Sequence, residues 1–147
     1  MKRQQLLDKL DREWGAFSAS YAGLTTGELE EHGAVGEWSV KDILGHVTTW
    51  EDECIKALKL FQQTKRPPRY GGVDKFNAVE WKRGLPLRQV VRELQESDQR
   101  TVAFIGTLPE QHFAYDRPFR HRIRLDTYGH YPEHTGSFLA WRKKRGT

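Results

Sequence analysis

The sequence predicts an all-α protein built as a bundle of four long helices. Apolar residues recur at three- and four-residue steps through residues 2–21, 39–63, 87–107 and 126–144, a pattern typical of helices that bury one face. Clusters of proline and glycine separate several of these segments. Within the irregular or extended segment 113–126, residues 119–125 alternate as a strand does, and the chain offers no partner strand. A helical bundle is therefore the expected architecture.

Composition favours a single domain that spans residues 1–147. A chain of this length buries about two-thirds of its unfolded surface around one core. Cys54 is the only cysteine, which excludes an intrachain disulfide, and no run of about 18 apolar residues suggests a membrane span. The N-terminal segment carries acidic and basic residues and no apolar signal-peptide core, so we expect a cytoplasmic location.

The second long segment has the clearest helix start. Ser39 is well placed as the N-cap, with Asp42 three residues further on, and a cap of this type stabilises a helix by about 1 kcal/mol. At about 100° per residue, Asp42, His46, Trp50 and Glu53 fall within one sector of this helix. An imidazole, two carboxylates and an indole ring are therefore expected to face the interior of the bundle.

Glycine and proline residues that break helices divide the first half of the chain into segments. The first helix is expected to end near Gly23, followed by a short turn or helix that runs to Glu31. Two prolines and two glycines within residues 65–72 predict a long crossover loop. Residues 73–83 are predicted to form a short helix before the third long segment.

The second half is expected to contain one irregular connection between two helices. Pro109 follows the end of the third long helix. Residues 113–126 are interpreted as an extended connection lying on the bundle. The last helix is expected to begin between Thr127 and Tyr131, because Pro132 is compatible with the first turn of a helix.

Three histidines are the strongest candidates for chemistry. His130 and His134 stand one helical turn apart, and His46 on another helix is expected to point inward. Three neutral imidazoles with open coordination positions are typical of a catalytic site for Zn²⁺, Ni²⁺ or a similar ion. A His-x-x-x-His pair alone is a weak signal, and two partly exposed histidines at a helix start are the plainer alternative. The combination of all three carries the hypothesis.

The last helix also matches a zinc-peptidase pattern. Residues 130–134 read His-x-x-Glu-His. Pro132 lies inside this motif, where a peptidase needs an undistorted helix, so we set the peptidase interpretation aside. Glu133 is interpreted as a solvated charge or as a base beside the site, and Glu53 and Asp42 have a similar standing near His46.

Two motifs resemble those of a known family. Residues 36–47 read GEWSVKDILGHV and residues 130–134 read HYPEH. This pairing resembles the DinB-like superfamily of bacterial four-helix-bundle proteins, which includes YfiT-type and ClbS/DfsB groups. Residues 74–77, Trp81 and residues 85–87 look most like the ClbS/DfsB group.

The resemblance implies a specific architecture and site. It implies an up-down-down-up bundle, often a homodimer, with a divalent metal on His46, His130 and His134. Activities in this superfamily include transfer of low-molecular-weight thiols and related isomerase or hydrolase reactions. The ClbS group includes a self-resistance hydrolase that opens an electrophilic cyclopropane.

The leading hypothesis is a metal-dependent transferase or hydrolase that acts on a small molecule. Zinc or nickel would activate a bound thiol or water, with a low-molecular-weight thiol as a candidate cosubstrate. Glu53 and Glu133 are the candidate catalytic carboxylates. The expected substrate pocket consists of Trp50, Phe76, Asn77, Trp81, Tyr128 and Tyr131. The alternative for each of these side chains is packing in the core.

Two other classes of protein remain as alternatives. The first is a metal-free protein of the ClbS/DfsB type that sequesters a hydrophobic electrophile. The second is a nucleic-acid-binding protein, suggested by a basic segment and a basic tail. These basic residues are Arg117, Arg120, Arg122, Arg124, Arg142, Lys143, Lys144 and Arg145, with Phe119 interleaved. The net charge of +4 is diffuse and no reading helix is recognised, so this alternative ranks last.

Overall fold

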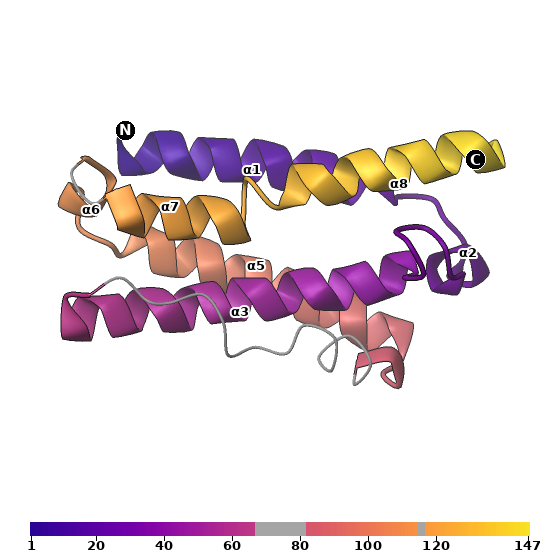
Figure 1. The fold of residues 1–147 in the computed structure, drawn as a ribbon, viewed down its shortest axis with the longest axis horizontal. Coiled ribbons are helices and arrows are strands. Elements are labelled where there is room, and N and C mark those ends of the chain that lie inside the picture. Colours follow the sequence, from indigo (N-terminus) through magenta and orange to yellow (C-terminus); the bar gives the residue numbers. More distant parts are fainter. Residues whose placement is uncertain (67–81, 115–116) are drawn as a thin grey trace.

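The computed structural model is a helical bundle (Figure 1) and describes residues 1–66, 82–114 and 117–147. Its helices are α1 (Arg3–Ser20), α2 (Thr26–Glu30), α3 (Val40–Thr64), α5 (Leu87–Gly106), α6 (Gln111–Ala114), α7 (Arg117–Asp126) and α8 (Tyr131–Arg145). Within the described residues there is no β-strand, and a single bridge pairs Val35 with Trp38. The all-α prediction is confirmed.

The long helices follow the expected up-down-down-up course. In Figure 1, α1 runs in one direction, α3 and α5 run in the other, and α7 and α8 together return in the direction of α1. α3 packs against α5, α1 packs against α8, and α7 packs against α3. The fourth position of the bundle is therefore filled by two helices rather than one.

The predicted start of α3 is confirmed at atomic detail. The Ser39 hydroxyl accepts a hydrogen bond from the Asp42 amide at 3.0 Å, and the Asp42 carboxylate accepts one from the Ser39 amide at 3.0 Å. This reciprocal pair satisfies two amides that a helix start leaves open. Asp42 also binds the Arg83 side chain at 3.1 Å, so its carboxylate serves the fold and does not join the histidine site.

The prediction of an extended connection at residues 113–126 is wrong. Residues 117–126 form helix α7, followed by a short turn before α8. Phe119 and Ile123 are fully buried on one face, whereas Leu125 is 41% exposed. Phe119 and Ile123 fit both a two-residue and a four-residue repeat, and the ion pair between Arg122 and Asp126 at 2.5 Å joins residues one helical turn apart. Tertiary burial resolves the ambiguity in favour of the helix.

The core between α1 and α8 is aromatic. Trp14 and Phe17 from α1 pack on Tyr131, with ring centroids 5.3 and 5.8 Å away. Phe138 stacks on Phe17 at 5.8 Å. Cys54 is fully buried, as predicted for a core residue. This packing fixes the first turn of α8, which carries two of the three histidines.

Two further observations concern the chain as a whole. In the described part, none of the helices combines the length and apolar character that a membrane span requires. Residues 73–81 of the predicted short helix and most of the predicted crossover fall outside the described residues.

Candidate metal centre

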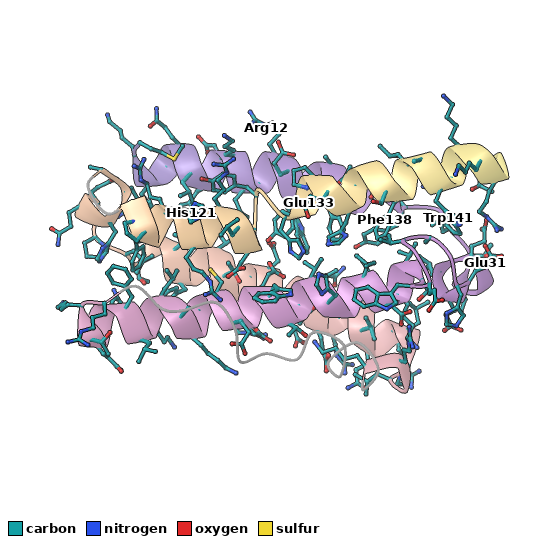
Figure 2. All side chains as sticks on the ribbon, in the orientation of Figure 1. Arg12, Glu31, His121, Glu133, Phe138 and Trp141 are labelled. Carbon is teal, nitrogen blue, oxygen red and sulfur yellow. The ribbon has the colours of Figure 1, made fainter. Side chains whose placement is uncertain are left out.

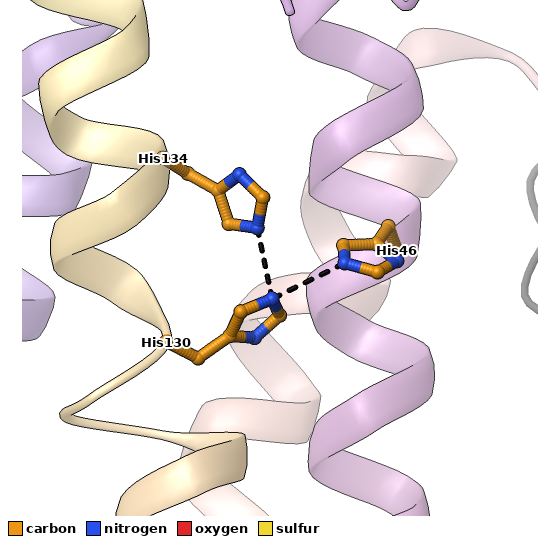
Figure 3. A group of neighbouring side chains, drawn as sticks. All are labelled: His46, His130 and His134. Atoms are coloured by element: carbon orange, nitrogen blue, oxygen red, sulfur yellow. Dashed lines mark hydrogen bonds between the residues drawn. The ribbon is translucent and has the colours of Figure 1, made fainter. Parts of the chain in front are cut away.

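Two helices bring the three histidines together. His46 projects from the second turn of α3, while His130 is the N-cap of α8 and His134 follows one turn later. Figure 3 shows the three rings converging between the two helices. The Nε2 atom of His130 lies 3.1 Å from Nε2 of His46 and 2.8 Å from Nε2 of His134. One nitrogen from each ring lies within 4.8 Å of both others.

The donor set fits one divalent ion. A single imidazole nitrogen carries either one proton or one lone pair, so Nε2 of His130 cannot form good hydrogen bonds to both neighbours at once. A tetrahedral zinc ion with Zn–N bonds of about 2.0–2.1 Å separates its nitrogen ligands by about 3.4 Å. Two of the separations between the histidine nitrogens, 3.1 and 2.8 Å, are slightly shorter than this value, and all three nitrogens lie within 4.8 Å of one another. Three histidines that converge in this way are able to share one cation.

The surroundings keep the site dry and hold the rings in place. His46 and His134 are only 8% and 9% exposed. Burial lowers the pKa of His134 to about 4, so this imidazole is neutral at pH 7 and offers a lone pair. The rings of Trp38 and Trp50 flank His46, with centroids 5.6 and 6.4 Å away. The site therefore has a neutral nitrogen donor in His134, and indole rings flank His46.

A cavity of about 270 Å³ opens onto the histidines. Besides the three rings, it is lined by Trp50, Leu125, Asp126 and Glu133. Figure 2 labels Glu133 on the α8 side, next to the histidines in the chain. The volume is near the lower end of the range for small-molecule sites.

Several predicted site residues lie elsewhere. Glu53 pairs with Lys56 at 3.2 Å and is not among the cavity-lining residues. Tyr131 is fully buried, and its hydroxyl donates a hydrogen bond to Glu51 at 2.7 Å. Tyr128 lines a separate cavity. The structure thus brings Trp50 and Glu133 to the histidines and leaves these three side chains apart from them.

The remaining predicted pocket residues are Phe76, Asn77 and Trp81, which lie outside the described residues.

Sequence reasoning missed two residues of the cavity. Leu125 and Asp126 come from the end of α7, a segment that the sequence analysis treated as extended. Asp126 is 2% exposed and pairs with Arg122. The four-residue spacing of these opposite charges was the available signal for a helix. It could not show that the carboxylate lies near the histidines.

The fold and the site define a class, the helical bundles whose facing helices present three histidines able to hold one divalent ion. Residues 9–141 match the DinB superfamily. The chain belongs to this superfamily, as its motifs suggested. The match does not distinguish the ClbS/DfsB group from the others.

Two solved structures share the fold. A protein from Streptococcus pneumoniae superimposes with a TM-score of 0.77 at 10% identity, covering 97% of this chain and 91% of the other. An uncharacterised protein from Escherichia coli UTI89 also gives a TM-score of 0.77, at 17% identity, covering 99% and 95%. No curated protein matches the chain.

Proposed function

We propose that this protein is a metal-dependent enzyme that acts on a small molecule and uses His46, His130 and His134 to hold one divalent ion. The observation that carries this proposal is the convergence of three imidazole nitrogens at the edge of a cavity. Zinc and nickel are the proposed ions, because borderline ions accept imidazole ligands readily.

The ion would supply Lewis acidity, lowering the pKa of a bound thiol or water. The side chains around the cavity would do the remaining work. Trp50 and Leu125 would contact the apolar part of a substrate. By covering part of the cavity, these two side chains would also limit the access of bulk water. Transfer of a low-molecular-weight thiol and hydrolysis are the two reactions compatible with such a site.

Glu133 is the proposed proton acceptor. It is exposed, lines the cavity and precedes His134 in the chain, so its carboxylate can exchange protons with solvent. Glu53 is a weaker candidate because it pairs with Lys56.

Metal content tests the proposal. We expect one divalent ion per chain in the wild-type protein and none in His46→Ala, measured by mass spectrometry of the purified proteins. His32→Ala is the matched control, because His32 is exposed and binds the carbonyl oxygen of Glu37. This control should retain the ion.

Equal metal content in wild type and His46→Ala would contradict the proposal. If all three proteins lack metal and a hydrophobic electrophile still binds, the metal-free sequestration alternative replaces it. The ClbS/DfsB assignment, the homodimer and the cytoplasmic location expected from the sequence stay predictions.

A further inference from the structure

A second, larger cavity lies beside α7, and none of its described lining residues lines the histidine cavity. Its volume is about 510 Å³, and its lining consists of Met1, Pro118, Arg120, His121, Arg124 and Tyr128. Figure 2 labels His121 on α7 and Glu133 on α8, one from each cavity. The proposed metal chemistry makes no use of this second cavity.

Among the described residues, the two arginines of this cavity lack the acidic partners that several other arginines have. Arg83, Arg100 and Arg122 each pair with an aspartate at 3.1 Å or less. Arg120 and Arg124 form no ion pair with any residue that the structure describes. They lie one helical turn apart, so both guanidinium groups can reach one ligand.

Arg120 has a buried donor that needs an acceptor. Its Nε atom is shielded from solvent and has no hydrogen-bond partner among the described residues. Buried polar groups in folded proteins are nearly always paired, and an orphaned one points to a missing ligand or water. The acceptor is expected to be anionic, because the guanidinium group of Arg120 carries a positive charge.

Tyr128 adds an aromatic wall to the positive charge. Its side chain is 8% exposed, and Nζ of Lys9 lies 5.3 Å from the centre of its ring. Burial raises the pKa of Tyr128, and the charges of Arg124 and Arg120 act in the opposite direction. Both arginines and Tyr128 line the same cavity.

We propose that this cavity binds a small organic anion, a carboxylate or phosphate group carried on an apolar body. The two guanidinium groups would hold the anionic oxygens, since their planar donors match carboxylate and phosphate geometry. The ring of Tyr128 and Pro118 would contact the apolar body. A volume of about 510 Å³ accommodates such a ligand.

The geometry disfavours a nucleic acid at this surface. Arg122 points inward and is 6% exposed, and Phe119 is fully buried. Arg122 is therefore directed to the core while Arg120 and Arg124 line the cavity, and these three side chains do not form the continuous stripe that a phosphate backbone requires.

Calorimetric titrations of the full chain test the proposal. The probes are phenyl phosphate, benzoate and inorganic phosphate, compared at one ionic strength. We expect saturable binding of at least one organic probe and weaker binding of inorganic phosphate, which cannot use the aromatic wall. Comparing the first two probes shows whether phosphate or carboxylate is preferred.

Three variants make the test specific. Arg120→Gln and Arg124→Gln should each weaken binding of the organic probe about tenfold, because each substitution removes one positively charged guanidinium group. Arg12→Gln is the matched control, since Arg12 is exposed on α1 and lines neither cavity; we expect its affinity to stay within about twofold of wild type. If circular dichroism shows that Arg120→Gln does not fold, the affinity of Arg124→Gln, whose side chain is exposed in the wild type, tests the proposal.

His46→Ala separates this site from the histidine cavity and should bind the probe as wild type does. Loss of binding in His46→Ala would overturn the proposal, because the anion would then sit at the histidines. Equal losses in Arg12→Gln and Arg124→Gln, or no saturable binding of any probe, would overturn it as well. Equal affinity for inorganic phosphate and phenyl phosphate would overturn the claim that the ligand carries an apolar body.

Discussion

Glu51 lies in the interior of the bundle, where a carboxylate is costly. Its side chain is fully buried and accepts a hydrogen bond from the Tyr131 hydroxyl at 2.7 Å. Burial raises the pKa of Glu51 to about 8; the bond from Tyr131 lowers it and the charge of Asp98 raises it. Glu51 is therefore mostly protonated in the folded protein at pH 7. The sequence does not mark Glu51 as special, because no local pattern distinguishes a buried glutamate from an exposed one.

Glu51→Gln is expected to flatten the dependence of stability on pH. The folded state holds the Glu51 proton up to about pH 8, whereas the unfolded chain releases it near pH 4.5. Between these values the folded state binds more protons, so the free energy of unfolding falls as pH rises, by up to about 1.4 kcal/mol per pH unit. Glutamine keeps the acceptor for Tyr131 and removes this linkage. Urea denaturation at several pH values between 5 and 8 measures the slope.

The control for this measurement is Glu53→Gln. Glu53 is on the same helix and pairs with Lys56 near the surface, so its substitution should leave the wild-type slope unchanged. A Glu51→Gln protein whose stability still falls as steeply as wild type between pH 5 and pH 8 would show that Glu51 titrates normally.

At the scale of the element, α7 shows how one pattern can serve two structures. In a strand, Ile123 and Leu125 would share a face, whereas in a helix they lie about 200° apart. The structure buries Ile123 completely and leaves Leu125 41% exposed. The helix also places Leu125 and Asp126 at the histidine cavity and Arg120 and Arg124 at the second cavity. α7 is thus the element shared by both candidate sites.

Alanine substitutions distinguish the two backbone structures. Ile123→Ala should lower the free energy of unfolding by about 2–5 kcal/mol, the usual cost of a cavity in a core. Leu125→Ala should cost less than about 1 kcal/mol, because its side chain is partly in solvent. Chemical denaturation of both variants gives the comparison. Equal losses would indicate that both side chains face the core.

At the scale of the whole molecule, the histidines connect helices that are distant in sequence. His46 comes from α3, and His130 and His134 come from the start of α8, which runs antiparallel to α3. The Glu51–Tyr131 hydrogen bond joins the same two helices. An ion held by all three histidines would therefore bind the folded bundle in preference to the unfolded chain.

Added zinc or nickel is expected to stabilise the fold. At a free ion concentration about 100 times the dissociation constant, the gain is about 2.7 kcal/mol, measured as a rise in melting temperature of chelator-treated protein. His46→Ala should lose most of this gain, and His32→Ala should keep it. A melting temperature that does not respond to either ion would contradict metal binding at the histidines.

Much of the fold was predictable from the chain because its causes are local. The capping box of Ser39 and Asp42 predicted the start of α3, and Pro132 predicted the first turn of α8. The one-turn spacing of His130 and His134 predicted that both rings face the same way, since helix geometry sets that relation. The inward position of His46 followed from the apolar stripe of its own helix.

Tertiary packing decided what periodicity leaves open. A repeat of three or four residues defines a helix face but not the neighbour that covers it. Tyr128 and Tyr131 were both expected at the substrate pocket, yet Tyr128 lines the second cavity and Tyr131 binds the buried Glu51. The helical state of α7 and the meeting of His46 with His130 depend on contacts between segments far apart in the chain. The sequence by itself determined the four long helical segments and the candidate donors, and the packing of α3, α7 and α8 determined the helical state of α7 and which donors meet.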